Sequence, residues 1–229
     1  MKKHYAWLWF DADGTLFNFE KAEVIALRNA FQSVNAHYED EYLEIFRGIN
    51  QRVWQALERR EITPDILSLR RFESLADALH LTCSPRDLSA GFLEHLSQQV
   101  ELIDGAFEVL SAFHASCRIA IVTNGLQVVQ RRRLGHSMIR HFISEVIISE
   151  EVGAPKPEPA FFAAASARMG NPATSDILLI GDSLASDIRS GIAYGLDTCW
   201  YNPKDEPRPE ALPITYEITH LRELLKLVA

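Results

Sequence analysis

Short runs of apolar residues, each ended by a polar or glycine-containing turn, recur along the chain and predict β-strands. There are five such runs, and they cover Tyr5–Phe10, Arg118–Val122, Glu145–Ile148, Asp176–Ile180 and Thr198–Tyr201. The middle three runs are almost continuously apolar and rich in Ile and Val. This composition is typical of strands that are buried on both faces of a parallel sheet.

Segments with helical spacing alternate with these strands. Apolar residues recur at intervals of three over 107–113, and further helices are predicted over 159–169, 184–193 and 220–227. Strands that alternate with helices indicate βαβ units. The chain is therefore predicted to have an α/β fold built on a doubly wound parallel sheet.

The stretch from about Glu20 to about Glu101 breaks this alternation, because it shows helical patterns and no convincing strand. Pro64 and Pro85 stand where helices within it would begin. The stretch falls between the first and second predicted strands. We therefore predict an α/β core domain of residues 1–18 and 102–229, with a helical domain of residues 19–101 inserted into it.

Composition and charge narrow the class of protein. The chain has 229 residues, with 23 basic and 31 acidic side chains, a net charge of −8 and no long run of Lys or Arg. This balance argues against general nucleic-acid binding and against an anionic membrane surface. The three cysteines are widely spaced and outside any C-x-x-C pair, which fits a reducing compartment. With no signal-peptide pattern and no membrane-spanning apolar run, we expect a cytoplasmic protein, and nothing in the sequence implies a partner protein.

The strongest local signal is an acidic turn directly after the first predicted strand, Asp11-Ala12-Asp13-Gly14-Thr15. Carboxylates two residues apart on an extended segment project to one side. At the carboxyl end of a strand they face the crevice where open α/β sheets bind ligands. The alternative, a helix-capping acid in an ordinary turn, suits Asp13 alone better than it suits the whole pattern.

Two further signals suit an anion. Thr123 and Asn124 end the second predicted strand, where a hydroxyl and free backbone N–H groups form an anion site, although a helix cap is the common alternative. Lys156 lies between Pro155 and Pro157, which restrict its backbone. A lysine held in this way provides a fixed charge for a phosphate, whereas a lysine without such a context is usually an ordinary surface residue.

A second acidic pair, Asp182 and Asp187, follows the fourth predicted strand. Acid oxygens at such a position suit Mg²⁺, which prefers hard oxygen ligands. Asp187 alone would also suit the first turn of a helix that begins near Leu184. Four signals in order at the ends of four parallel strands are together improbable as coincidences. They predict a nucleophile, an acid/base, a phosphate cradle, a cation and a metal site.

The order of these motifs resembles the haloacid dehalogenase superfamily of phosphohydrolases. Asp11, Asp13 and Thr15 match the D-x-D-x-T motif of this superfamily. The later motifs are matched by Thr123, Lys156, Asp182 and Asp187. The resemblance implies a Rossmann-like core with a helical cap domain. It implies that Asp11 attacks phosphorus and forms an aspartyl-phosphate, and that Asp13 protonates the leaving oxygen and then activates water. A second acid such as Asp13 favours a phosphatase over a dehalogenase.

The same resemblance implies the binding roles. Phosphate is held by Thr123, Asn124 and Lys156. The metal is Mg²⁺, with Mn²⁺ or Co²⁺ as substitutes. Its ligands are Asp11, Asp182, the backbone carbonyl of Asp13, and Asp187 directly or through water.

Several stretches are similar to bacterial pyrimidine 5'-nucleotidases, among them 71–74, 148–153 and 199–202. The substrate implied is a pyrimidine nucleoside 5'-monophosphate such as dUMP, UMP or dTMP. Within the helical insert, Asn50, Trp54 and Arg71 are candidate substrate-binding residues, although aromatic residues at helical spacing more often belong to a core. Two alternatives stay open: a phosphatase or mutase for a sugar phosphate, and a non-catalytic phospholigand-binding protein.

Overall fold

The computed structural model describes residues 2–229, and Met1, with which the predicted core domain begins, lies outside them. The chain divides into two compact units. The core unit comprises the segment that ends at Asn18 together with Glu101–Gln127 and Leu134–Ala229, and the helical unit comprises Phe19–Val100 and Val128–Arg133. The helical unit thus takes in Val128–Arg133, which the sequence placed in the core. Val128–Arg133 lies outside the inserted stretch in sequence, so its position along the chain did not indicate that it belongs to the helical unit.

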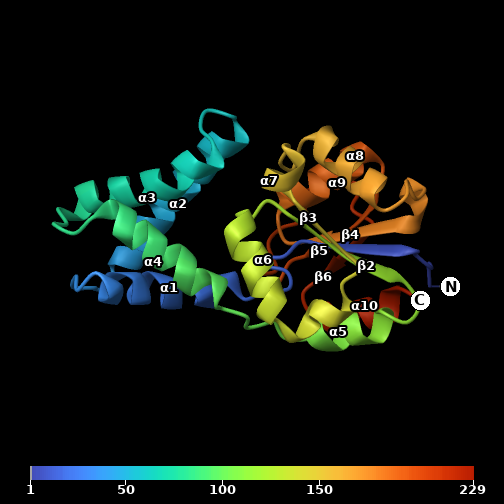
Figure 1. Cartoon of the computed structure of the whole chain (residues 1–229). Helices are drawn as coiled ribbons and strands as arrows, with labels where there is room; N and C mark the ends of the chain where they lie inside the picture. The colour runs from blue at the N-terminus through green and yellow to red at the C-terminus, as the bar shows by residue number, and fades with distance from the viewer. Residues whose placement is uncertain (1) are drawn as a thin grey trace. The chain divides into compact units, whose positions relative to one another are not determined.

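The core unit contains a six-stranded, fully parallel sheet with the order β3-β2-β1-β4-β5-β6 (Figure 1). The strands are β1 (Trp7–Phe10), β2 (Arg118–Thr123), β3 (Glu145–Ile148), β4 (Ile177–Gly181), β5 (Asp197–Tyr201) and β6 (Tyr216–Ile218). The predicted α/β fold with a parallel sheet is confirmed, and all five predicted strands are present. The sequence missed β6, because it has only three residues and Glu217 interrupts its apolar pattern.

Helices connect the strands of the core unit. They are α5 (Ala106–Phe113), α6 (Gln127–His136), α7 (Ser149–Val152), α8 (Pro159–Arg168), α9 (Ser190–Tyr194) and α10 (Leu224–Leu227). A π-helical turn, Leu184–Arg189, precedes α9, and 3₁₀ turns cover Met138–Phe142, Thr174–Asp176 and Leu221–Glu223. The sequence analysis expected a helix after Thr123 and Asn124 but did not predict the bounds of α6, because its run of Gln and Arg side chains carries no regular apolar stripe.

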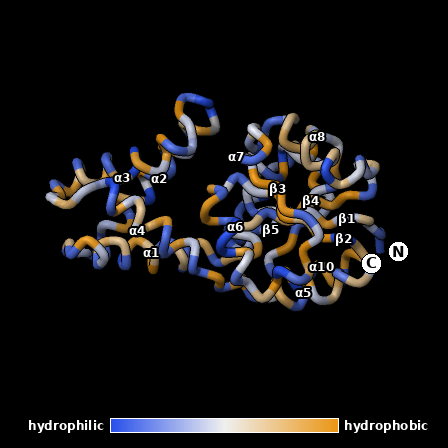
Figure 2. Tube along the Cα trace, viewed as in Figure 1, coloured by the Kyte–Doolittle hydropathy of each residue, from blue (hydrophilic) through white to orange (hydrophobic). Residues whose placement is uncertain are grey.

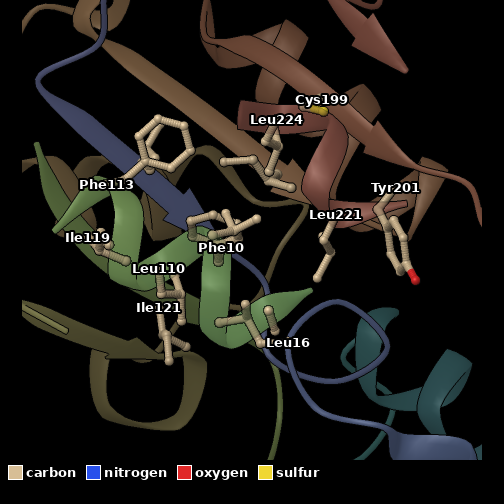
Figure 3. Close-up of a cluster of buried hydrophobic side chains, with 14 of the residues drawn as sticks. Phe10, Leu16, Leu110, Phe113, Ile119, Ile121, Cys199, Tyr201, Leu221 and Leu224 are labelled. Carbon is tan, nitrogen blue, oxygen red and sulfur yellow. The ribbon is translucent and has the colours of Figure 1, made fainter. Parts of the chain in front are cut away.

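Apolar side chains pack on both faces of this sheet. Hydrophobic residues recur along the central strands of the Cα trace (Figure 2). Successive residues of β1 point to opposite faces, as expected for a strand. Phe10 packs in one cluster with residues of α5 and α10 (Figure 3), whereas Trp9 packs in another with residues of α8. Among residues 2–229, every helix is too short or too polar to cross a lipid bilayer.

The stretch Phe19–Val100 of the helical unit forms α1 (Phe19–Ser33), α2 (Tyr42–Glu58), α3 (Pro64–Leu79) and α4 (Pro85–Ser97). Helix α1 packs along α4, and α3 packs against both α2 and α4. At the centre, Phe46, Phe72 and Phe92 bring their rings within 5.2 to 5.4 Å of one another, centroid to centroid. Phe72 is fully buried, so it belongs to the core of this unit.

Candidate active site

The register of the sheet gathers polar residues at one edge of the core unit. Strand β1 lies between β2 and β4, with Phe10 paired to Ile121 on one side and to Ile180 on the other. The backbone N–H of Asp11 extends this ladder by donating to the carbonyl of Ile180 at 2.9 Å. The polar residues that directly follow β1, β2 and β4 therefore start from the same edge, as expected for the ligand-binding edge of an open α/β sheet.

Asp11, Asp182 and Asp187 form a cluster of carboxylates at this edge. One oxygen from each lies within 4.8 Å of the others. Asp187 stands in the first turn of the π-helical segment, where its Oδ2 accepts a hydrogen bond from the backbone N–H of Ser183 at 3.1 Å. Asp187 therefore makes the helix-start contact that the alternative interpretation predicted, and it also belongs to the acidic cluster.

Lys156 is the cation of this cluster. Its Nζ donates to Asp11 Oδ1 at 2.6 Å, to Asp187 Oδ1 at 2.6 Å and to the carbonyl of Val122 at 2.8 Å. These three bonds use all three donors of the ammonium group. With 1% of its surface exposed, Lys156 is not the ordinary surface lysine of the alternative interpretation.

Burial and mutual repulsion shape the electrostatics of the cluster. Burial holds the pKa of Asp11 well above its usual range, and Asp187 and Asp182 act in the same direction against Lys156. Burial, followed by the charge of Asp187, raises the pKa of Asp182 to about 6. Burial alone would lower the pKa of Lys156, but Asp11 and Asp187 outweigh it and raise that pKa. One ammonium group balances only one of three carboxylates, so a divalent cation with a preference for oxygen ligands fits the donors present.

Two glycines make room for the acids. Gly14 has a φ of +84°, and a Cβ there would lie 2.6 Å from Asp182 Oδ2. A Cβ on Gly181 would lie 2.4 Å from the carboxyl carbon of Asp187. Neither glycine was selected from the sequence as a functional residue, because the need for each depends on which side chain faces it.

Thr15 supports the cluster from the acidic turn. Its hydroxyl donates to Asp182 Oδ1 at 3.0 Å, and the side chain is fully buried. The sequence identified Thr15 only as part of the D-x-D-x-T motif, without a role. Asp13, from the same turn, is partly buried, and its carboxylate is not one of the three that form the cluster.

Thr123 and Asn124 do not cap the helix that follows them, because α6 begins at Gln127 and its N-cap residue is Leu126. The hydroxyl oxygen of Thr123 accepts the N–H of Gly125 at 3.0 Å, which leaves the hydroxyl hydrogen for another acceptor. The side-chain amide of Asn124 is bound to the backbone of Lys156 through both its oxygen and its nitrogen. This contact gives Asn124 a partner that the sequence did not indicate.

The three candidate substrate-binding residues lie in the helical unit. Asn50 and Trp54 stand one turn apart on α2, and Arg71 stands on α3. The Nη1 of Arg71 donates to Asn50 Oδ1 at 3.2 Å, and both residues are buried, whereas Trp54 is half-buried. The structure therefore brings Asn50 and Arg71 together.

Residues 8–201 match the haloacid dehalogenase-like hydrolases. The chain belongs to this family, which confirms the resemblance drawn from the motifs. Together with the acidic site at the carboxyl edge of the sheet, this makes the protein an enzyme, a phosphoric monoester hydrolase. A non-catalytic binding protein is therefore no longer an alternative.

Particular relatives resemble the chain over nearly its whole length. Pyrimidine 5'-nucleotidase YjjG of Escherichia coli is 33% identical over 97% of this chain and 97% of its own. Pyrimidine 5'-nucleotidase PynA of Streptococcus pneumoniae is 30% identical over 96% of this chain and 94% of its own. The crystal structure of the HAD-hydrolase YfnB of Bacillus subtilis, bound to magnesium, superposes with a TM-score of 0.90 at 34% identity and covers 99% of both chains.

Proposed function

We propose that the protein is a Mg²⁺-dependent phosphatase that hydrolyses pyrimidine nucleoside 5'-monophosphates, such as dUMP, UMP and dTMP, through an aspartyl-phosphate on Asp11. The observation that carries the chemistry is the buried contact of Lys156 with Asp11 and Asp187 at 2.6 Å each. It holds the carboxylate of Asp11 in a fixed position, which a weak nucleophile needs if it is to attack phosphorus.

The metal would be held by Asp11, Asp182 and Asp187, together with the backbone carbonyl of Asp13. The surplus negative charge of the cluster and its oxygen donors fit Mg²⁺, with Mn²⁺ or Co²⁺ as substitutes. A divalent ion at such a site neutralises charge on the phosphoryl group and helps to position it. Thr15 orients Asp182 for this task through its hydrogen bond.

The remaining residues of the core unit would bind the phosphate and move protons. The hydroxyl hydrogen of Thr123 is left for a phosphate oxygen, because its oxygen already accepts from Gly125. Lys156 acts through its charge, since its three donors are in use. Asp13 would protonate the leaving oxygen and then take a proton from the water that attacks the aspartyl-phosphate.

The choice of substrate is supported by two observations. Two relatives that match nearly the full length of the chain are pyrimidine 5'-nucleotidases. The helical unit carries Trp54, Asn50 and Arg71, and an aromatic face beside amide and guanidinium groups suits a flat ring with polar edges. We propose that residues 19–101 act as a cap domain that selects the leaving group. The cytoplasmic location stays a prediction.

The experiment that tests the proposal is a phosphate-release assay with dUMP, UMP, dTMP, AMP, GMP and glucose 6-phosphate at one Mg²⁺ concentration. We expect the pyrimidine nucleotides to give the highest kcat/KM, and EDTA to abolish turnover until Mg²⁺ is restored. Equal or better values for AMP or glucose 6-phosphate would favour a purine-accepting or sugar-phosphate phosphatase. Full turnover in EDTA would refute the metal-dependent mechanism.

A further inference from the structure

Arg71 is enclosed by aromatic side chains inside the helical unit. Its guanidinium carbon lies 4.7 Å from the ring centroid of Phe92, 5.5 Å from that of Phe72 and 5.9 Å from that of Phe46. Only 2% of the residue is exposed, and within the described part of the chain its Nε and Nη2 have no hydrogen-bond partner. Its Nη1 donates a hydrogen bond to Asn50 Oδ1. A cation held in this way has little freedom to turn.

This fixed cation determines the orientation of the Asn50 side chain. A guanidinium group has five N–H donors and no acceptor, so only the oxygen of an amide can face it. The carbonyl end of Asn50 is thereby used, 3.2 Å from Arg71 Nη1. The turned orientation would place the amide N–H groups of Asn50 against those of Arg71, which is repulsive. Asn50 is therefore left with a pair of donors, on Nδ2, and no second acceptor group.

Asn50 is 7% exposed, and its Nδ2 keeps some contact with solvent. Among residues 2–229, no hydrogen bond from Asn50 Nδ2 is found. This nitrogen is not one of the fully buried side-chain atoms that lack a partner, whereas Nε and Nη2 of Arg71 are. Trp54 stands four residues further along α2, and side chains with this spacing share one face of a helix. The ring of Trp54 is half-buried, so the face presents an aromatic surface beside two amide donors.

We propose that Asn50 is a specificity-determining residue that donates to the 4-carbonyl oxygen of uracil or thymine, and that Arg71 is the residue that positions it. The inference rests on the proposed function, because it names the base edge that a pyrimidine nucleotidase recognises. Cytosine carries an amino group at the same position, which would place donor against donor. Trp54 provides the surface against which the ring stacks. The enzyme therefore prefers UMP, dUMP and dTMP over CMP.

The test compares kcat/KM for UMP and CMP in the native enzyme and in Asn50→Asp. The aspartate keeps an oxygen for Arg71 but replaces the two donors by an acceptor. We expect the native enzyme to prefer UMP by about 10- to 100-fold, as for one hydrogen bond satisfied or opposed in an enclosed site. We expect Asn50→Asp to lose this preference or to reverse it, because its free oxygen accepts from the amino group of cytosine.

Three controls make the result specific. Gln51→Glu adds the same charge at the neighbouring, exposed position of α2, and it should leave the UMP/CMP ratio unchanged. Arg71→Lys keeps a donor for Asn50 and should keep the ratio, whereas Arg71→Met should narrow it. Hydrolysis of p-nitrophenyl phosphate, which has no base to recognise, reports that a variant is folded. Gln51→Glu should keep the native rate with this ester, and the UMP/CMP ratio is compared among the variants that still hydrolyse it.

The outcomes separate this inference from the proposed function. A native enzyme that hydrolyses CMP as well as UMP, or an Asn50→Asp variant with the native ratio, overturns the role of Asn50 alone. If no pyrimidine nucleotide is hydrolysed faster than glucose 6-phosphate while p-nitrophenyl phosphate is turned over, the proposed function fails, and this inference fails with it.

Discussion

The side chain of Asn124 binds the backbone of Lys156 at both ends of its amide. Its Oδ1 accepts the N–H of Lys156 at 2.8 Å, and its Nδ2 donates to the carbonyl of the same residue at 2.8 Å. The sequence placed Asn124 among the phosphate-binding residues, whereas these contacts engage its amide with the lysine. Because Lys156 Nζ contacts Asp11, the amide of Asn124 helps to determine where the carboxylate of Asp11, the proposed nucleophile, lies.

We expect Asn124→Ala to lower kcat/KM by about 10- to 100-fold, because a displacement of about 1 Å in a catalytic group has an effect of this size. If Asn124 acts through Lys156, the two residues should not contribute independently. In a Lys156→Met background, the added Asn124→Ala change should therefore cost little further activity. The measurement is a double-mutant cycle on kcat/KM for UMP.

Asn202 offers a matched control, because its amide binds the backbone of Glu206 in the same two-sided manner, at 3.0 and 2.9 Å. Asn202→Ala should lower the melting temperature about as much as Asn124→Ala does. Its effect on kcat/KM should be the same in the native and the Lys156→Met backgrounds. Full additivity of Asn124→Ala and Lys156→Met would show that Asn124 acts by another route, such as direct phosphate binding.

Thr15 is expected to act on metal affinity. Its hydroxyl donates to Asp182 Oδ1, and loss of such a supporting hydrogen bond typically weakens metal binding by about 10- to 100-fold. Thr15→Val should therefore need more Mg²⁺ for half-maximal activity and should recover at high Mg²⁺, whereas Thr15→Ser should behave as the native enzyme. A Thr15→Val enzyme with an unchanged Mg²⁺ requirement would contradict this role.

The parts of the fold that follow from local pattern were predictable from the sequence. The apolar runs at β1, β2, β3, β4 and β5 reflect burial on both faces of a sheet, and the acids at strand ends reflect the edge where parallel strands bind ligands. Strand β6 was missed because a short strand with Glu217 at its centre has no apolar run. The bounds of α6 were not predicted for a related reason, because its sequence is rich in Arg and Gln and shows no apolar stripe.

The contacts within the site were less predictable, because they depend on the path of a loop in three dimensions. Lys156 lies eight residues beyond the end of β3, and nothing local to it indicates that its three donors go to Asp11, Asp187 and a strand carbonyl. The partner of the Asn124 amide, the backbone of Lys156, is 32 residues away in sequence, so nothing local to Asn124 indicated this contact.

Gly181 is expected to be intolerant of even a methyl group. A Cβ there would lie 2.4 Å from the carboxyl carbon of Asp187, so Gly181→Ala has to displace an acid that Lys156 holds. We expect activity to fall by at least about 100-fold, in line with a misplaced catalytic group.

The control is Gly135→Ala, because Gly135 lies exposed on α6 and a Cβ added there would have no other atom within 4 Å. That change should keep full activity and stabilise the protein by about 0.5–1 kcal/mol, measured by denaturant unfolding.

The acidic cluster is expected to destabilise the metal-free protein as pH rises. The pKa of Asp182 is raised to about 6 in the folded protein, mainly by burial and then by Asp187, whereas an unfolded aspartate titrates near 3.9. The folded state therefore holds this proton more tightly, and the stability that the bound proton provides is lost as pH rises through 6.

In EDTA, Asp182→Asn should melt at a higher temperature than the native protein, by more at pH 8 than at pH 5. Mg²⁺ should raise the melting temperature of the native protein and not that of the variant, and the reverse pattern would exclude a metal site here.

The role of Asp13 predicts a different time course for two substrates. If Asp13 protonates the leaving oxygen, Asp13→Asn should hydrolyse UMP at least about 100-fold more slowly, because general acid–base catalysis contributes at least this much. p-Nitrophenolate is a stable leaving group and needs no such proton, so the first step with p-nitrophenyl phosphate should still proceed. The second step needs Asp13 to activate water and should be slow. Asp13→Asn should therefore release a burst of p-nitrophenolate, at most equal to the enzyme concentration, followed by slow turnover, when observed by stopped-flow absorbance.

The control is Asp11→Asn, which lacks the proposed nucleophile and should give no burst. Steady turnover of p-nitrophenyl phosphate by Asp13→Asn without a burst would show that another group activates the water, and native turnover of UMP would remove Asp13 from the mechanism.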